Sequence, residues 1–112
     1  MKLAREMRGK VAIVKPLERQ MDALIAADFR KQMEAFVKEG QALFILDLSE
    51  VDFVDSSGLG TIIACLKMLG GRGDLVIAGA GEKIISLFKL TRMDRVFQIF
   101  PSTDEALAVL SV

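Results

Sequence analysis

The sequence predicts an α/β fold, with a mixed, mostly parallel central sheet of four to five strands and about four helices. Short apolar runs alternate along the 112-residue chain with segments whose apolar residues recur every three or four positions. This alternation is typical of parallel strands joined by right-handed helical crossovers. The length suits one domain, which we expect to span residues 1–112.

The first half of the chain is expected to form a hairpin, a helix and a central strand. Residues 3–7 and 11–14 lie on either side of a short turn, which favours a β-hairpin. Apolar residues between 21 and 37 share one helical face, and Gly40 follows as the residue that ends the helix. Residues 43–46 form an unbroken apolar run, which is typical of a strand covered on both faces.

The second half continues the alternation to the end of the chain. Ser102 is a suitable N-cap for the last helix, and Glu105 completes a capping box. The expected elements are a helix over 57–69, a strand over 75–78, a helix over 82–90, a strand over 96–100 and a helix through 110.

Composition excludes several classes of function. Fifteen basic and fifteen acidic residues give a formal net charge of zero, which provides no electrostatic reason to bind nucleic acid or an anionic membrane. The absence of His excludes Ser-His-Asp and Cys-His catalysis and His-containing zinc sites. The single Cys cannot form an internal disulfide or a thiolate cluster, so we expect no metal site and no oxidising compartment.

The N-terminal segment is charged and lacks the apolar stretch of a signal peptide. No apolar run approaches the roughly 20 residues of a spanning helix. We therefore expect a cytoplasmic protein that does not insert into membranes.

The segment 51–60 joins a predicted central strand to a helix, and so lies at the carboxyl end of the sheet, where open α/β sheets place their sites. Asp55, Ser56 and Ser57 precede the apolar part of the helix, where free backbone N–H groups and the helix dipole favour an anion. Gly58 and Gly60 are expected to expose that backbone. Such a place suits a phosphate, including one formed by phosphorylation of a serine. The alternative is that Ser56 or Ser57 only caps the helix.

Residues 55–60 read Asp-Ser-Ser-Gly-Leu-Gly, which resembles the signature of STAS domains, and more narrowly that of bacterial anti-sigma factor antagonists. The resemblance extends through residues 46–49, 73–78 and 90–97, and covers about residues 10–110. It departs at residues 15–19, Lys-Pro-Leu-Glu-Arg, where the family has a Gly-Asp-like turn that often borders the partner surface.

The resemblance implies a phosphorylation-controlled partner switch that is not itself an enzyme and needs no cofactor. In that family the unmodified protein binds an anti-sigma factor that is also a serine kinase with a histidine-kinase-like ATPase fold. Phosphorylation of the first serine of the motif, here Ser56, releases the antagonist, and a PP2C-type serine phosphatase restores it. Asp55, Ser57, Gly58 and Leu59 are then expected to line the contact loop.

The helix after the motif has two apolar faces. One face is expected to meet the core, and the second is weakly polar and continues the line of Ser57. A helix of this kind is either covered by a neighbouring helix or docks a partner. The residues of the second face, which are candidates for partner contact, are Thr61, Ala64, Cys65 and Met68.

Other interpretations of these residues are weaker. A Ser-Lys hydrolase would need Lys67, which lies almost three turns along the helix. Gly79 and Gly81 resemble part of a dinucleotide fingerprint, but Ile84 stands where its third glycine belongs.

Two further alternatives depend on carboxylates. A receiver domain would use an aspartate such as Asp47, but it would also need an acidic pair after the first strand, where Lys15 and Pro16 stand. A Mg²⁺ site could in principle use Asp47, Asp52 and Asp55, although acids near a loop are more often solvated.

The stronger alternative keeps the fold and changes the role. Some STAS domains that resemble this one are interaction subunits of transport complexes, without a phosphorylation cycle. The intact Ser56 favours the switch, because a structural subunit needs no phosphorylatable hydroxyl there.

Overall fold

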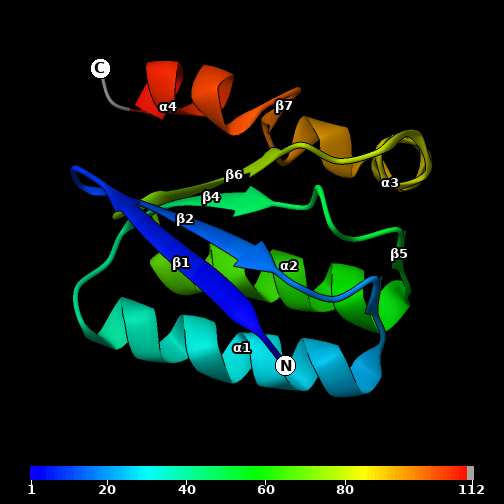
Figure 1. Cartoon of the computed structure of the whole chain (residues 1–112), viewed down its shortest axis with the longest axis horizontal. Coiled ribbons are helices and arrows are strands. Elements are labelled where there is room, and N and C mark those ends of the chain that lie inside the picture. Colours follow the sequence, from blue (N-terminus) through cyan, green and yellow to red (C-terminus); the bar gives the residue numbers. More distant parts are fainter. Residues whose placement is uncertain (111–112) are drawn as a thin grey trace.

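The structure is a computed structural model that describes residues 1–110; Ser111 and Val112, at the end of the predicted domain, lie outside the described residues. Figure 1 shows the arrangement of the elements. In chain order they are β1 (Leu3–Arg8), β2 (Val11–Pro16), β3 (Gln20–Met21), α1 (Ala23–Lys38), β4 (Leu43–Asp47), β5 (Phe53–Val54), α2 (Ser56–Leu69), β6 (Asp74–Ala78), α3 (Glu82–Leu90), the 3₁₀ turn η1 (Met93–Arg95), β7 (Ile99–Phe100) and α4 (Thr103–Leu110).

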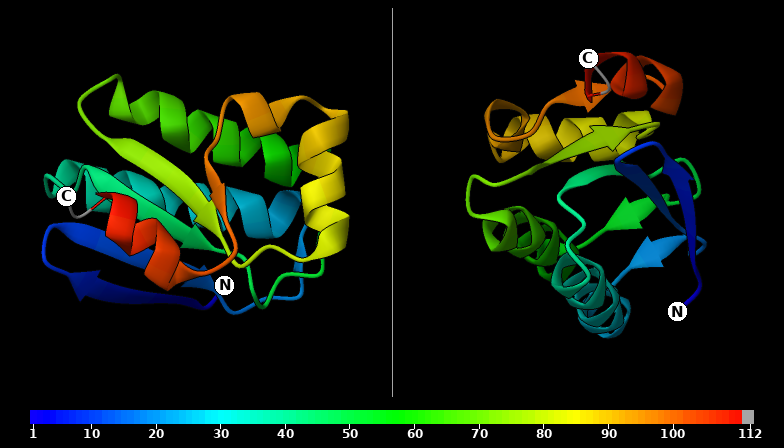
Figure 2. Two further views of the ribbon diagram at one scale, coloured as in Figure 1. Left: turned by 90° about the horizontal axis from the view of Figure 1, so that it is seen from above. Right: turned by 90° about the vertical axis from the view of Figure 1, so that its left-hand side faces the viewer.

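The middle layer is a five-stranded sheet in the order β1-β2-β4-β6-β7. β1 pairs antiparallel with β2, and the remaining pairs are parallel. α1 and α2 lie side by side on one face of this sheet, and α4 packs on the other face (Figures 1 and 2). The predicted α/β fold, with a mixed and mostly parallel sheet and four helices, is confirmed.

The central strands bury side chains on both faces of the sheet. In β4, Phe44 and Leu46 belong to the core beneath α1 and α2, whereas Ile45 belongs to the core beneath α4. The same division places Ile77 on one side of β6 and Val76 on the other. Because both faces of the sheet are covered, residues 43–46 are apolar throughout and do not alternate with polar residues, as the sequence predicted.

The hairpin and the end of α1 also follow the prediction. Arg8 pairs with Val11 across the β1–β2 turn, and Gly9 has φ = 61°. Gly40 follows the C-cap Glu39 with φ = 99°, a conformation that glycine adopts without a steric penalty. These positions explain why glycine stands at both turns.

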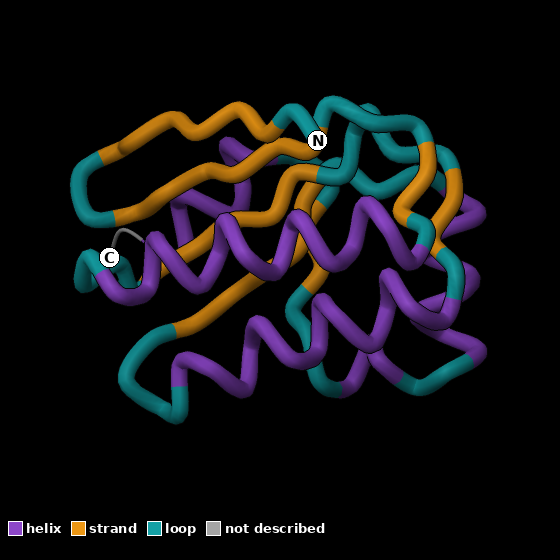
Figure 3. The backbone as a smooth tube through the Cα atoms, turned by 90° about the horizontal axis from the view of Figure 1, so that it is seen from below, coloured by secondary structure: helices purple, strands orange, loops and turns teal. Residues whose placement is uncertain are grey.

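A two-stranded parallel sheet of β3 and β5 was not predicted (Figure 3). Met21, which the periodicity assigned to the first helix, lies in β3 and is fully buried. The helix begins after Asp22, whose carboxylate accepts a hydrogen bond from the Ile25 N–H at 3.0 Å. Two-residue strands are too short to show a period, so they escape a search for alternation.

The last strand is shorter than predicted. Only Ile99 and Phe100 pair with β6, and Met93–Arg95 form a 3₁₀ turn. Phe97 instead turns into the core, with its ring centroid 5.8 Å from that of Phe88. Ser102 caps the final helix as predicted, since the Glu105 N–H donates to Ser102 Oγ at 3.2 Å. The predicted capping box is only half formed, because among the described residues the Glu105 carboxylate accepts no hydrogen bond in return.

Across residues 1–110, no helix combines the length and the apolar character needed to cross a membrane.

Candidate functional site

The loop between β5 and α2 lies at the carboxyl end of the sheet and is held by the short β3–β5 sheet. The N–H groups of Asp52 and Phe53 donate to the Arg19 carbonyl at 2.7 and 3.1 Å, and the Asp55 N–H donates to the Met21 carbonyl at 3.3 Å. The Arg19 guanidinium also pairs with the Asp52 carboxylate at 2.8 Å. The atypical segment 15–19 therefore ends directly against this loop.

Sequence reasoning missed the part that Arg19 and Met21 have in holding the loop. Both contribute backbone carbonyl oxygens, and any residue type supplies those atoms. The sequence pattern of strands and helices indicates only that these two residues come before a helix.

Asp55, and neither serine, caps α2. Its carboxylate accepts a hydrogen bond from the Gly58 N–H at 2.9 Å, and its backbone is extended, as N-cap residues are. Ser56 is the first residue of the helix, and both Ser56 and Ser57 are exposed. Among the described residues, no hydrogen bond occupies either serine hydroxyl. The alternative that a serine caps the helix is wrong, because the neighbouring carboxylate already fills that place.

Gly58 does not expose the backbone, contrary to the prediction. It is buried, and its N–H is taken by Asp55. A Cβ at Gly58 would lie 2.5 Å from the Met21 carbonyl oxygen and 2.9 Å from Val54 Cγ1. Gly60 is exposed, with nothing within 4 Å of an added Cβ, so only Gly60 leaves open surface beside the serines.

The predicted second face of α2 is mostly covered by a neighbouring helix. α1 packs along α2. Cys65 has 1% of its surface exposed, and the charges of Arg30 and Glu34, both on α1, act on its thiol. Cys65 is therefore a core residue, which corrects its prediction as a surface contact. Leu59 is also buried, at 8% exposure.

Three residues of the predicted face keep part of their surface. They are half-buried and lie along the helix that begins at Ser56: Thr61, Ala64 and Met68. Of the four residues predicted for this face, only these three keep surface that a partner could contact.

Burial raises the pKa of the Cys65 thiol to about 12. The uncharged form dominates far above neutral pH, so this thiol is a small apolar side chain and not a nucleophile.

We expect alkaline pH to destabilise the fold through Cys65. In the unfolded chain this thiol ionises near its ordinary pKa of 9.0, whereas the folded chain keeps it protonated to about pH 12. Between these values the unfolded state binds fewer protons, so the free energy of unfolding falls by ~1.4 kcal/mol per pH unit. From about pH 8 to about pH 10.5, denaturant titrations should show wild type losing ~2 kcal/mol more than Cys65→Ala. Equal losses would contradict this expectation.

The carboxylates proposed for Mg²⁺ each have a separate protein partner. Asp47 accepts from the Ser49 N–H at 3.0 Å, Asp52 pairs with Arg19, and Asp55 caps α2. Within residues 1–110, no group of three or more acidic or Cys side chains is placed to hold a metal ion. These contacts favour a structural role for all three acids.

The glycines after β6 form a tight turn into α3. Gly79 has φ = 70°, and an added Cβ there would lie 2.9 Å from Asp47 Oδ1. Gly81 is the N-cap of α3. The close approach to Asp47 explains the glycine at 79 without a dinucleotide.

Comparisons with known proteins agree with this fold. The family model described as "STAS domain" matches residues 3–106. The anti-sigma-B factor antagonist of Listeria monocytogenes is 35% identical over 82 residues, which are 71% of this chain and 71% of the relative. The crystal structure of a putative anti-sigma factor antagonist from Thermotoga maritima superposes with a TM-score of 0.90 at 26% identity, and covers 98% of this chain and 95% of that one.

The Bacillus cell fate determinant SpoIIAA, solved in its phosphorylated form, shares the fold at a TM-score of 0.73 and 15% identity, with 96% of this chain and 97% of that one covered. The fold and the serine loop together define a small α/β domain with a mixed, mostly parallel sheet, of the class that includes bacterial anti-sigma factor antagonists. The chain belongs to the STAS domain family, and within it to the anti-sigma factor antagonist type.

Proposed function

We propose that this chain is an anti-sigma factor antagonist that acts as a phosphorylation-controlled partner switch in the cytoplasm. The unmodified form binds an anti-sigma factor that is also a serine kinase with a histidine-kinase-like ATPase fold. Phosphorylation of Ser56 releases the partner, and a PP2C-type serine phosphatase reverses the modification. The chain is then the substrate of these enzymes and is not an enzyme itself.

The exposed and unoccupied hydroxyl of Ser56 carries the proposal. Because Asp55 caps α2, Ser56 Oγ is free to attack the γ-phosphorus of ATP held by a kinase. In that step the bond from the γ-phosphorus to the ADP oxygen breaks, ADP leaves, and the hydroxyl proton passes to a base of the kinase. The phosphorylated form of SpoIIAA gives an example of this fold in a phosphorylated protein.

The electrostatic effect of the phosphate is large enough for a switch. A phosphoserine adds about −1.5 to −2 charges. At roughly 6 Å from an acidic group, with an effective dielectric constant of ~20 to 80, the repulsion is about 1–5 kcal/mol. Each ~1.4 kcal/mol weakens binding tenfold. After transfer, the phosphoserine faces both Asp55 and the phosphates of the bound ADP.

We expect phosphorylation to map to Ser56 alone. Purified serine-kinase anti-sigma factors of the source organism, incubated with ATP, Mg²⁺ and this chain, should add one phosphoryl group, measured by intact-mass spectrometry. Ser56→Ala should gain no mass and stay bound, Ser56→Asp should bind at least tenfold more weakly, and Ser57→Ala should behave as wild type. Phosphorylation mapped only to Ser57 would overturn the assignment.

The alternative role, as a subunit of a transport complex, makes the opposite prediction. A chain of that kind would gain no phosphoryl group with any of these kinases. The curated relatives favour the switch, because they are named as anti-sigma factor antagonists.

A further inference from the structure

The strand β1 forms one edge of the five-stranded sheet, and its outer side has no neighbouring strand. β1 pairs only with β2, in an unbroken register from Leu3 to Arg8. Figure 2 shows β1 at the end of the sheet, with α1 between it and α2. All residues of β1 except Leu3 are exposed. An open edge strand is a template to which another strand can pair.

The backbone groups of alternate residues of β1 point away from β2. The Leu17 N–H donates to the Lys2 carbonyl at 2.9 Å, so Lys2 faces the side of β2. Because hydrogen-bonded residues alternate along an antiparallel pair, the even-numbered residues of β1 bond to β2. The N–H and C=O groups of Leu3, Arg5 and Met7 therefore point outward, and no hydrogen bond within residues 1–110 uses them.

The opposite edge of the sheet offers fewer free groups. β7 has two residues, and the carbonyls of Gln98 and Phe100 accept hydrogen bonds from the side of β6. Only Ile99 turns both its N–H and its C=O outward, and Pro101, which has no N–H, follows directly. β1 is therefore the edge at which a strand can be added over several residues.

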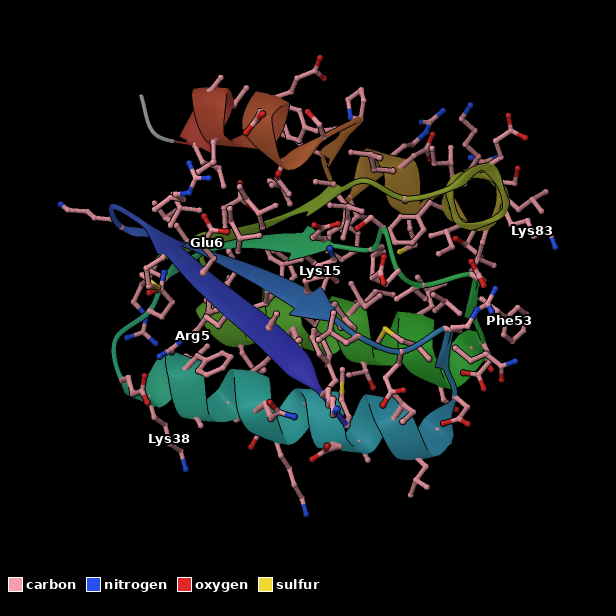
Figure 4. All side chains as sticks on the ribbon, in the orientation of Figure 1. Arg5, Glu6, Lys15, Lys38, Phe53 and Lys83 are labelled. Atoms are coloured by element: carbon pink, nitrogen blue, oxygen red, sulfur yellow. The ribbon has the colours of Figure 1, made fainter. Side chains whose placement is uncertain are left out.

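β1 lacks most of the features that prevent pairing at sheet edges. Edge strands are commonly protected by proline, by a β-bulge or by charged side chains. β1 contains neither a proline nor a bulge. Figure 4 shows its charged residue Arg5 directed toward α1 and Glu6 toward the opposite face. The Arg5 guanidinium lies 4.4 Å from the ring centroid of Phe36 and pairs with Glu39 at 3.3 Å, so its charge is held away from the edge.

We propose that β1 is the interface of a symmetric dimer, in which it pairs antiparallel with β1 of a second copy about a twofold axis at Arg5. The two sheets then form one continuous sheet, and the contact is isologous, as in most homodimers. In this register Leu3 lies opposite Met7 of the second copy, and every outward N–H and C=O of Leu3, Arg5 and Met7 has a partner. The inference does not depend on the proposed function.

The register follows from the positions of the outward groups. A twofold axis at Ala4 leaves Met7 without a residue of the other β1 strand opposite it, and an axis at Glu6 does the same to Leu3. The axis at Arg5 is the one that pairs all three outward residues within the strand. It also covers the Met7 side chain, which is 46% exposed in one copy, with Leu3 of the other.

The charges of the chain permit a second copy as the occupant. The formal net charge is zero, so two copies do not repel each other overall. Two Arg5 side chains face each other across the axis, and like charges at such positions oppose pairing. Each of them is already drawn toward Glu39 of its own α1, which reduces this repulsion. The attraction comes mainly from the backbone hydrogen bonds.

The dimer is expected to be weak, since one pair of edge strands buries less than a standard interface of about 1,600 Å², and we expect a dissociation constant of about 1–100 µM. Sedimentation equilibrium of the purified chain across this range measures it. Met7→Pro removes the outward N–H of Met7 and keeps the hydrogen bonds between β1 and β2, so it should weaken the dimer at least tenfold with an unchanged circular dichroism spectrum.

Two controls accompany this variant. Met7→Ala keeps the N–H and removes most of the side chain, so it should weaken the dimer less than Met7→Pro does. Ile99→Pro is the matched control at the other edge, because it also removes an outward N–H that the sheet does not use. It should leave the dissociation constant within twofold of that of wild type.

A pair of introduced cysteines tests the register without proline. Ala4 and Glu6 of the second copy would form a non-hydrogen-bonded pair with Cα atoms about 4.5 Å apart, a separation that a disulfide spans. Ala4→Cys/Glu6→Cys should therefore form a covalent dimer with oxidised glutathione, which takes up the two electrons of each disulfide and becomes two reduced glutathione molecules. In either single variant the two thiols lie on diagonal positions about 7–8 Å apart, and no covalent dimer should form. Cys65 is buried and should not react.

The outcomes decide between the two edges and between the registers. If the chain sediments as a monomer throughout and the double-cysteine variant does not cross-link, the dimer is overturned. If Ile99→Pro dissociates the dimer and Met7→Pro does not, the interface lies at β7 and the assignment to β1 is wrong. Cross-linking of Ala4→Cys alone would place the axis at Ala4 and contradict the register centred on Arg5.

Discussion

Replacement of Gly58 by Ala is expected to destabilise the protein by about 1–3 kcal/mol. Gly58 lies in the first turn of α2, where helix propensity alone would make alanine more stable by ~1 kcal/mol. The added methyl would instead lie 2.5 Å from the Met21 carbonyl oxygen, which also accepts the Asp55 N–H. Relief of this contact must move either α2 or the β3–β5 sheet that holds the serine loop.

Gly60→Ala is the matched control, two residues further along the same helix. Nothing lies within 4 Å of a Cβ at Gly60, so this variant should be more stable than wild type by up to ~1 kcal/mol. Urea denaturation of both variants measures the difference. If Gly58→Ala were as stable as Gly60→Ala, the close packing of α2 against Met21 would be contradicted.

The same contact gives Gly58→Ala an effect on signalling. A shift of the first turn of α2 moves Ser56 relative to Asp55, and with it the hydroxyl that the kinase must reach. We expect slower phosphorylation of the folded Gly58→Ala variant, whereas Gly60→Ala should retain most of the wild-type rate.

The fold was predictable because its signals are long or chemically specific. The apolar runs of β4 and β6, the periodic face of α1 and the Ser102 cap each agree with the structure. The β3–β5 sheet was not predictable, because each strand has only two residues and the sheet is held largely by carbonyl groups of Arg19 and Met21. Every residue type has the same backbone carbonyl group, so the sequence does not reveal these hydrogen bonds.

The position of the site was predictable, but which of its residues caps the helix and which stays exposed was not. Residues 55–60 mark the strand-to-helix loop, yet Asp, Ser and Ser are all good N-caps. Only the structure shows that Asp55 takes the role and leaves Ser56 free. Beside this loop, α3 packs against β5 and brings Phe53 and Leu90 to one pocket, although they are 37 positions apart in the sequence.

Cys65→Glu is expected to lose about 3–5 kcal/mol of stability, out of the 5–15 kcal/mol typical of a folded domain. Cys65 is 1% exposed between α2 and α1, and Arg30, the cation whose charge acts on its thiol, already pairs with Glu34 at 3.1 Å. A carboxylate at position 65 would be a buried charge without a free partner. Burial raises the pKa of the introduced carboxyl, so the loss should ease as the pH falls and the group becomes neutral.

Two controls separate the charge from other effects of this substitution. Cys65→Ala removes the sulfur without adding charge, and should cost about 1 kcal/mol. Lys67→Glu places a carboxylate two residues away on an exposed position, and should cost less than ~1 kcal/mol, mainly through the helix dipole. Urea denaturation at neutral and acidic pH compares the three. If Cys65→Glu kept its stability but lost kinase binding, Cys65 would belong to the partner surface and not to the α1–α2 contact, and α1 would have to lie further from α2 than it does here.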